Sequence, residues 1–410
     1  MKLLFTAFYT VLTSIAHAQY NGTGSVTQGP ATTVISNMYT CAGGRVTNVG
    51  TITASDNTVW TVPASVNFQN SAFPFASDLY NSCTGHLYAN STAALAALNG
   101  SDIITIDTDG ELITAFVFAD NYFEMYINGT PVGKDDVPFT QFNSNIIRFR
   151  VKRPFTIAMH LVDWEENLGL GSENNNGFAY HPGDGGMVAV FKDANNNIIA
   201  TTGPDWKAQT FYTSPITELA CPTEVGSLRS SAACSTADSN NGTLYYGLHW
   251  ALPTNWMDAA YNDADWPNAN TYTNAEIGVN NKPAYTNFTD IFDAPAKDAE
   301  FIWSSNVILD NEVIVRHKVL AATTSDDETE MTPFELVPNP ASKFVDIKSA
   351  INSSKEHALL QIFDTLGNCI YTSVRSETRI DTSTWLSGCY IVKYSCSKGV
   401  QFHKLIIQSN

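Results

Sequence analysis

The chain has 410 residues, of which 40 are Asp or Glu and 22 are Lys or Arg, so its formal net charge at pH 7 is −18. The acidic excess lies before residue 333, because residues 333–410 contain eight basic and six acidic side chains and the remainder has a balance of −20. A body of this charge repels nucleic acid phosphates and anionic lipids, so neither is expected as a partner.

The first 18 residues have the pattern of a secretory signal peptide. Lys2 is followed by an apolar run from Leu3 to Ile15 and then by Ala16-His17-Ala18, an Ala-x-Ala cleavage site. The run is shorter than the about 20 residues that cross a bilayer as a helix, and no later segment approaches that length. We therefore expect export of a chain that begins at Gln19 and has no transmembrane span.

The body has the periodicity of β-strands. In YFEMYINGTPVG the side chains alternate between two faces up to Asn128-Gly129, a pair that is typical of a hairpin turn. IIRFRVKRPF alternates apolar and basic residues, and the segment 91–100 is the one helix candidate. These patterns predict an all-β protein with one or two antiparallel jelly-roll or β-sandwich modules, followed by a small C-terminal β-sandwich.

Changes in composition along the chain suggest where its parts begin and end. The expected division is a signal peptide at 1–18, a β-sandwich or jelly-roll module at 19–220, a second β segment at 221–320, an acidic linker at 321–333 and the C-terminal β-sandwich at 334–410.

The C-terminal segment contains four short motifs in a fixed order. They are Pro338-Asn339-Pro340-Ala341, the turn from Ile362-Phe363-Asp364 to Gly367, Leu386-Ser387-Gly388-Cys389-Tyr390 and Lys404-Leu405-Ile406-Ile407. With these motifs the segment resembles the sorting domain of the type IX secretion system of Bacteroidetes. Cys369 and Cys389 stand where small or β-branched residues are commoner. The resemblance implies that the type IX machinery recognises the tail and that the protein reaches the outer-membrane surface or the extracellular space.

Two stretches of the body resemble galactose-binding-like jelly-roll modules. They are Trp256 with the Asp263-Ala264-Asp265-Trp266 stretch that follows it, and the strand that ends at Asn128-Gly129. Their order is the reverse of the order in that family. The resemblance thus implies either two modules or one permuted module, and no ligand residue is carried over.

Seven cysteines in an exported chain predict disulfides. Cys221 and Cys234 bracket a short polar stretch and are the best candidate for a local pair, and Cys41 with Cys83 is the next. Closing a loop of this order stabilises a fold by roughly 3 kcal/mol in the chain-entropy model. The tail has three cysteines, so at least one of them is unpaired.

The stretch HLVDWEENLGLGSENNNGFAYHPGDGG, residues 160–186, is rich in acids and glycines. Its first three residues continue a strand, and 163–186 is predicted to be an ordered loop between two strands. Calcium prefers six to eight oxygen ligands, which makes Asp163, Glu165, Glu166 and Asp184 candidate metal ligands. Two alternatives remain open. Basic residues one strand earlier could neutralise the acids, and a pair of carboxylates could act as acid and base, as in glycosidases. The basic residues are Arg148, Arg150, Lys152 and Arg153.

Tryptophans with polar neighbours suit stacking on sugar rings, which present apolar C–H faces. Trp164, Trp256 and Trp266 are the candidate ligand-binding residues, although tryptophan in β-sandwiches is also common in the core. The favoured function is therefore that of a secreted or surface protein that binds a polysaccharide or surface glycan. Calcium is the only cofactor that the sequence suggests. The alternatives are a polysaccharide hydrolase or lyase that uses the loop 163–186, and a structural surface protein.

Overall fold

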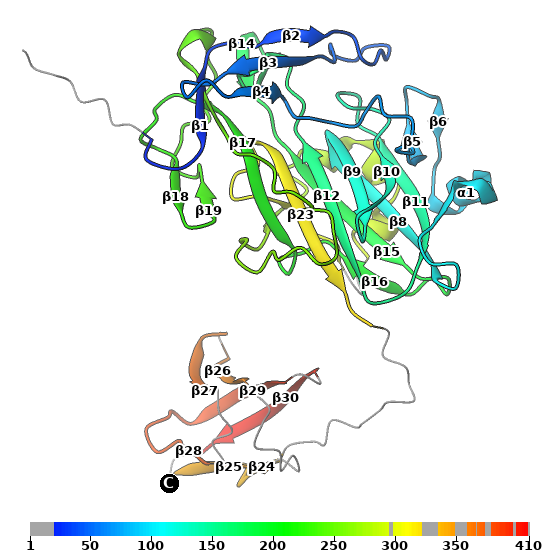
Figure 1. Cartoon of the computed structure of the whole chain (residues 1–410). Coiled ribbons are helices and arrows are strands. Elements are labelled where there is room, and N and C mark those ends of the chain that lie inside the picture. The colour runs from blue at the N-terminus through cyan, green and yellow to red at the C-terminus, as the bar shows by residue number, and fades with distance from the viewer. Residues whose placement is uncertain are drawn as a thin grey trace, which may run out of the picture. The chain divides into compact units, whose positions relative to one another are not determined.

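The computed structural model describes residues 20–294, 298–321, 335–348, 359–365, 367–373, 379–396 and 399–408. These residues belong to two compact units, a body that ends at Ala321 and a C-terminal unit that begins after it (Figure 1). The expected signal peptide and residues 322–333 of the expected linker lie outside the described residues.

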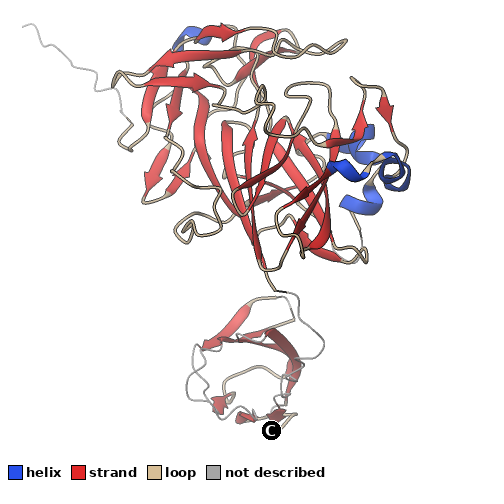
Figure 2. Ribbon diagram, turned by 45° about the vertical axis from the view of Figure 1, so that its right-hand side comes forward, coloured by secondary structure: helices blue, strands red, loops and turns tan. Residues whose placement is uncertain are grey.

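The body consists mainly of two large sheets (Figure 2). The seven-stranded sheet has the order β1 (Ser25–Gln28), β20 (Tyr246–His249), β17 (Lys207–Ile216), β23 (Asp310–Val319), β12 (Phe155–Val162), β9 (Tyr122–Ile127) and β10 (Thr130–Lys134). The nine-stranded sheet has the order β21 (Asn270–Tyr272), β22 (Phe301–Trp303), β15 (Gly186–Lys192), β8 (Glu111–Asp120), β11 (Ser144–Val151), β5 (Ser77–Asn81) and β6 (His86–Leu87), with β16 (Ile198–Thr201) beside β15 and β7 (Ile103–Thr105) beside β11.

Smaller elements surround the two sheets. They are the sheet of β2 (Thr32–Ile35), β3 (Val49–Thr53) and β4 (Val59–Val62), the hairpins β13 (Ser172–Asn175) with β14 (Phe178–Pro182) and β18 (Thr223–Val225) with β19 (Leu228–Ser230), the helices α1 (Ser91–Ala97), α2 (Pro283–Thr286) and α3 (Thr289–Phe292), and the 3₁₀ turns at Gly100–Asp102, Gly242–Leu244 and Val279–Asn281. Helix α1 lies where the sequence predicts one. None of the helices in the described residues is long and apolar enough to span a membrane.

The space between the two sheets holds the main hydrophobic core. Strand β11 buries Ile147, Phe149 and Val151 and leaves Arg148 and Arg150 partly exposed, which confirms the predicted alternation. The turn between β9 and β10 is also confirmed, because Asn128 and Gly129 have φ values of 49° and 83°. These left-handed conformations are those that a two-residue hairpin turn requires.

The seven-stranded sheet is covered on its second face as well, which the sequence does not predict. All residues of β9 and of β12 are buried. The Trp164 ring packs edge-on against Tyr122 with centroids 5.9 Å apart, and the Trp256 ring packs in the same way against Tyr126 at 5.3 Å. Trp266 packs against Phe211 at 5.8 Å.

These contacts correct the expectation that the three tryptophans stack on sugar rings. The three tryptophans are 1%, 4% and 8% exposed, in the order Trp164, Trp256 and Trp266. Their rings lie against the outer face of the sheet, so they offer no free face on which a sugar could stack. Their burial contributes to the stability of the fold instead.

The expected boundary near residue 220 is also corrected. Strand β20 lies between β1 and β17, and β23 lies between β17 and β12. The segment 221–320 therefore completes the sheets begun by residues 19–220, and the body is a single compact unit.

His160 lies in the middle of β12 and is satisfied there, as its place in a strand suggests. Its Nε2 lies 2.8 Å from the Glu312 carboxylate, and its Nδ1 lies 3.8 Å from that of Glu124. Burial alone lowers the pKa of His160, but the interactions with Glu124 and Glu312 outweigh it and raise the pKa to about 9. The histidine is thus part of a buried ion-pair network.

Two disulfides are present in the body, Cys221–Cys234 and Cys41–Cys83, and both predicted pairs are confirmed. Each closes its loop with a Cα–Cα distance that a disulfide can span, 5.0 and 5.3 Å respectively. In the tail, Cys369 and Cys389 are free.

The C-terminal unit is a small β-sandwich, as predicted. One sheet contains β24 (Glu335–Val337), β25 (Phe344–Lys348) and β28 (Arg379–Asp381), and the other contains β26 (Leu359–Phe363), β27 (Cys369–Ser373), β29 (Gly388–Cys396) and β30 (Gly399–Ile407). Both sheets contribute to one core, in which Val345 and Ile347 of the first contact a cluster that includes Ile362 and Val392 of the second.

A core substitution tests the role of the buried tryptophans. Trp256→Ala should lower the free energy of unfolding by about 3–5 kcal/mol, the usual loss for deleting a buried aromatic side chain. The measurement is chemical denaturation of the body. Val225→Ala, at a side chain that is 74% exposed, is the control and should change stability by less than about 0.5 kcal/mol. A loss below about 1 kcal/mol for Trp256→Ala would contradict the packing role.

Candidate ligand pocket

Three aspartates meet at one end of the two large sheets because each lies at a strand end. Asp120 is the last residue of β8, Asp163 directly follows β12, and Asp184 precedes β15. Strands β8 and β15 are neighbours, with Gly186 opposite Asp120. The chain crosses from the nine-stranded to the seven-stranded sheet at Asn121, whose backbone N–H donates to the carbonyl of Val162 at 3.3 Å. This bond holds Asp120 close to the end of β12.

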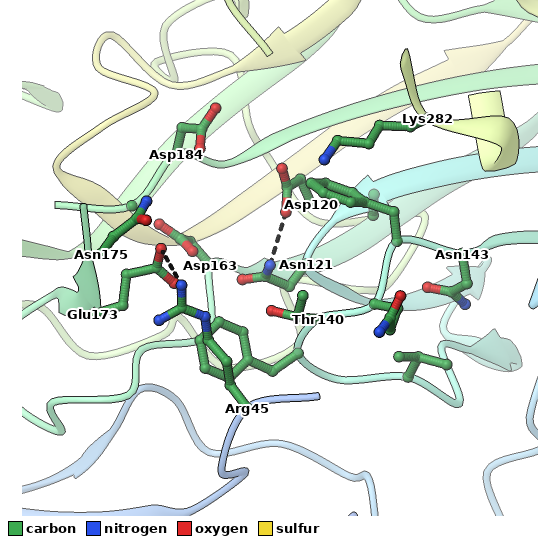
Figure 3. Close-up of a pocket in the computed structure, with 16 residues that line it drawn as sticks. Arg45, Asp120, Asn121, Thr140, Asn143, Asp163, Glu173, Asn175, Asp184 and Lys282 are labelled. Atoms are coloured by element: carbon green, nitrogen blue, oxygen red, sulfur yellow. Dashed lines mark hydrogen bonds and ion pairs between the residues drawn. The ribbon is translucent and has the colours of Figure 1, made fainter. Parts of the chain in front are cut away.

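The aspartates face a pocket of about 290 Å³ (Figure 3). This is the lower end of the range of about 300–1,000 Å³ that is typical of ligand sites. Besides the aspartates, its polar lining residues are Arg45, Asn121, Thr140, Gln141, Asn143, Glu173, Asn175 and Lys282. Apolar surface comes from Ala119, Val137, Phe139 and Phe142. The pocket therefore combines hydrogen-bonding groups with a small apolar wall.

The pocket's two basic residues are not equally available to its acids. The Arg45 guanidinium pairs with the carboxylates of Glu166 and Glu173 at 3.1 and 3.3 Å. It is therefore already neutralised. The Lys282 ammonium lies 4.3 Å from the centroid of the Phe142 ring and acts on Asp120 and Asp184 from a distance.

Asp163 stands out among the acids because nothing compensates its charge. Its side chain is 6% exposed, and among the described residues no hydrogen bond or ion pair reaches its carboxylate. Asp120, which is 3% exposed, accepts one hydrogen bond from Asn121 Nδ2 at 2.7 Å. A buried carboxylate without a partner is unfavourable, and native structures normally avoid it.

Burial and mutual repulsion both favour the protonated form of these groups. Burial raises the pKa of Asp120 and of Asp163 well above the ordinary value, and the neighbouring carboxylates raise both further. Burial raises the pKa of Asp184 to about 6, although His181 and Lys282 oppose the change. Clustered perturbed carboxyl groups in a concave site are typical of functional sites.

The four acids predicted to bind calcium do not converge. Glu165 is buried elsewhere, where its carboxylate accepts hydrogen bonds from the backbone N–H groups of Gly169 and Gly171 and, at 3.1 Å, from the Tyr212 hydroxyl. Glu166 pairs with Arg45. Only Asp163 and Asp184 of the predicted set line the pocket.

The arrangement of the acids bears directly on the metal hypothesis. Within the ranges that the structure describes, no three His, Cys, Asp or Glu side chains are arranged to hold a metal ion. Calcium binding by Asp163 and Asp184 stays a prediction, and Glu165 and Glu166 are removed from it because each has another partner.

The alternative that the basic strand neutralises the loop is also corrected. Arg153 pairs with Glu111, Lys152 pairs with Asp109 at 2.7 Å, and Arg148 donates to the backbone carbonyl of Asn99. The cation that does neutralise loop acids is Arg45, which is 121 residues from Glu166. Sequence reasoning missed Arg45 and Asp120 because both reach the site through the fold.

The acidic stretch contains a hairpin of its own, strands β13 and β14, which brings Glu173 and Asn175 to the pocket. Its turn is Asn176-Gly177, with φ values of 49° and 86°. The Asn-Gly pair was the signal that could have predicted this hairpin, as it did at Asn128-Gly129.

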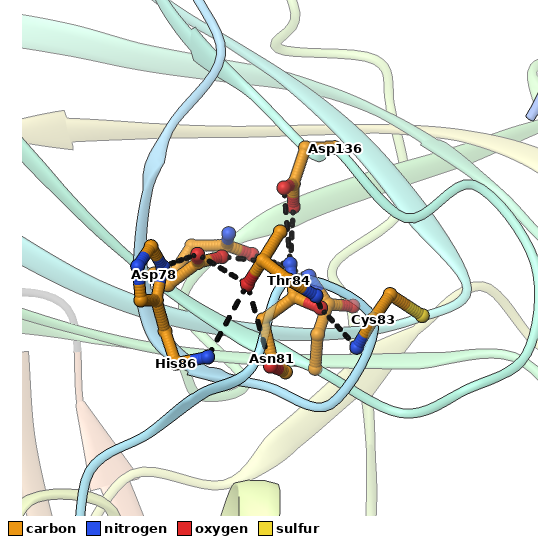
Figure 4. Close-up of polar contacts among 8 residues, drawn as sticks. Asp78, Asn81, Cys83, Thr84, His86 and Asp136 are labelled. Carbon is orange, nitrogen blue, oxygen red and sulfur yellow. Dashed lines mark hydrogen bonds and ion pairs between the residues drawn. The ribbon is translucent and has the colours of Figure 1, made fainter. Parts of the chain in front are cut away.

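A second polar cluster lies at the turn between β5 and β6 (Figure 4). The Asp78 carboxylate accepts hydrogen bonds from Asn81 Nδ2 and Thr84 Oγ1, and lies 2.6 Å from His86 Nδ1. Asn81 Nδ2 also reaches Asp136 at 3.0 Å. These groups have partners within the cluster, and the turn they hold carries Cys83 of the Cys41–Cys83 disulfide. Its evident role is therefore structural.

Comparison with known proteins identifies the tail. Residues 335–408 match the secretion system C-terminal sorting domain, which confirms the resemblance of residues 334–410. A chain with this domain is exported by the type IX system to the cell surface or the extracellular space. No curated protein matches the chain.

Solved structures give only distant similarities. PorZ, a surface component of the type IX secretion system of Porphyromonas gingivalis, is 19% identical over 24% of this chain and 14% of its own, with a TM-score of 0.17. A Faecalibacterium prausnitzii β-glucuronidase is 11% identical over 95% of this chain and 45% of its own, also at 0.17. Dimeric latent PorU of P. gingivalis is 11% identical over 94% and 34%, at 0.15. The chain thus spans less than half the length of each.

The uncompensated charge of Asp163 makes a testable prediction. Its folded-state pKa lies above the ordinary value of 3.8, so stability should fall as pH rises above that value. Asp163→Asn removes the charge and should raise the free energy of unfolding at pH 7–8 by about 1–3 kcal/mol, a gain that shrinks toward pH 4. The measurement is denaturant unfolding of the wild type and the variant at pH 8 and at pH 4.

The matched control is Glu166→Gln, at the carboxylate that pairs with Arg45 at 3.1 Å. This substitution removes an attractive interaction and should give no gain at either pH. A loss of stability for Asp163→Asn at pH 8 would show that its carboxylate has a stabilising partner.

Proposed function

We propose that this exported protein binds carbohydrate in the pocket formed by Asp120, Asp163 and Asp184. The observation that carries the proposal is the composition of the pocket, in which carboxylate and amide groups surround a small concave space with an apolar wall. Sugar hydroxyl groups need hydrogen-bond acceptors and donors, and carboxylates and amides supply both. The apolar faces of Val137 and Phe139 suit the C–H surface of a sugar ring.

The location of the protein agrees with this role. The sorting domain at 335–408 indicates a protein that acts at the cell surface or outside the cell. Polysaccharides and surface glycans are accessible there, and the negative body disfavours polyanions. The pocket takes the place of Trp164, Trp256 and Trp266 as the proposed binding site, because these tryptophans are buried.

Hydrolysis of the bound carbohydrate is the second candidate function. It is favoured by the raised pKa of the pocket aspartates, because a carboxyl group that keeps its proton near neutral pH can act as a general acid. A second, ionised carboxylate would then act as nucleophile or base. Asp163 and Asp184 both belong to the loop 163–186 from which this activity was expected.

One prediction of the proposed function concerns export. Deletion of residues 335–410 should leave the chain cell-associated, because the sorting domain is what the type IX machinery recognises. The measurement is fractionation of a host that has this system. Full-length protein with Asp163→Asn is the control and should be exported as the wild type is. Normal appearance of the truncated chain in the extracellular fraction would contradict the prediction.

The second prediction concerns binding. Affinity electrophoresis on plant and algal polysaccharides should show retardation that Asp120→Asn and Asp163→Asn each weaken, by roughly 1.5–3 kcal/mol for a lost hydrogen bond to a charged group. Asp109→Asn is the control, since this residue pairs with Lys152 and does not line the pocket. Absence of binding to any polysaccharide would contradict the proposal.

The same samples distinguish binding from hydrolysis. Release of new reducing ends that is abolished by Asp163→Asn or Asp184→Asn would favour the hydrolase. Retardation without release would favour pure binding.

A further inference from the structure

We propose that the pocket selects saccharides that carry a free ammonium group, that is, amino sugars without an N-acyl group. The proposal rests on the proposed carbohydrate binding and adds the charge of the ligand. It follows from which of the pocket's charges are compensated within the protein and which are not.

Three carboxylates of the pocket share a single cation. Arg45 is neutralised by Glu166 and Glu173, so its charge does not balance Asp120, Asp163 and Asp184. His181 also acts on Asp184, but it already pairs with Asp238 at 2.5 Å. Lys282 then remains for these three, and its ammonium lies over the Phe142 ring. A cation in the pocket favours the ionised form of these carboxyl groups over the protonated form that burial favours in the empty site. The pocket therefore favours a positively charged guest, whose binding releases their protons, over a neutral one.

Asp163 provides the specific partner for such a guest. It is more than nine-tenths buried, lines the pocket and has no hydrogen-bond partner among the residues described. Figure 3 shows its side chain among the labelled pocket residues, with Asp184, Glu173 and Asp120 around it. An ammonium group has three N–H donors and can satisfy more than one of these carboxylates at once.

The remaining groups of the pocket favour a sugar ring as the carrier of the ammonium. Asn175 and Thr140 lie around the aspartates and can exchange hydrogen bonds with hydroxyl groups. A lysine side chain has an aliphatic stem without hydroxyl groups and would leave these two groups without a hydrogen-bond partner from the ligand. A metal ion fits less well, since no three acids within the described ranges are arranged around a common metal position.

The experiment is titration calorimetry with a matched pair of ligands. Oligosaccharides of glucosamine and of N-acetylglucosamine, equal in length, share the same sugar chain and differ at the 2-amino group, which is a charged ammonium in the first and a neutral acetamide in the second. The free-amine oligosaccharide should bind roughly ten- to a hundred-fold more tightly at pH 7 and low salt, as expected for one charge-assisted hydrogen bond.

Two variants should shift this preference in opposite directions. Asp163→Asn should remove most of the discrimination, whereas Lys282→Gln should increase affinity for the free-amine ligand because it removes a competing cation. Asp109→Asn, outside the pocket, is the control. Circular dichroism of each variant verifies that it is folded.

Several outcomes would overturn the inference. Equal affinity for the two oligosaccharides would refute the charge preference and leave carbohydrate binding intact. If neither oligosaccharide binds while neutral polysaccharides still do, the charge preference is likewise refuted and carbohydrate binding stands. If no saccharide binds at all, both the charge preference and the proposed carbohydrate binding are refuted. Tighter binding of a lysine pentamer would show that the ammonium is recognised without the sugar. An Asp163-dependent rise of the unfolding midpoint with calcium, without amine preference, would assign the site to a metal.

Discussion

The burial of the seven-stranded sheet on both faces is the constraint on which the site depends. Strand β12 has eight consecutive buried residues, because the core lies on one side and a layer that includes Trp256 and Trp266 lies on the other. With both faces of β9 and β12 covered, side chains of these strands can meet a ligand only where the strands end. Asp163 is the first residue beyond β12, and Asp120 ends β8 of the other sheet. The pocket lies where these two ends meet.

The same constraint makes the pocket electrostatically unfavourable. The aspartates are far enough inside the fold to lose most of their hydration, and burial is the largest cause of their raised pKa values. The rest of the body compensates through its core and its two disulfides. A ligand that supplies the missing positive charge removes the free energy cost of burying these carboxylates. The affinity for such a ligand therefore includes the relief of that cost.

Features set by neighbouring residues could be predicted from the sequence. The hairpin turn at Asn128-Gly129, the alternation along β11, the Cys221–Cys234 disulfide and the sorting domain at 335–408 all depend on short segments. The burial of Trp164 could not be predicted, because it depends on packing against Tyr122, which lies in strand β9. Asp120 and Arg45 were missed for the same reason, since the fold brings them to the acidic stretch from far away in the sequence.

Three neighbouring acids show why composition alone could not locate the site. Asp163, Glu165 and Glu166 are equivalent in a count of carboxylates, but Glu165 is bound by backbone N–H groups and Glu166 by Arg45. Both therefore have partners within the fold and are unavailable to a ligand. Asp163 is the acid that the protein leaves without a partner in its described part, so the selectivity of the pocket is set by which charges the fold compensates rather than by how many acids it contains.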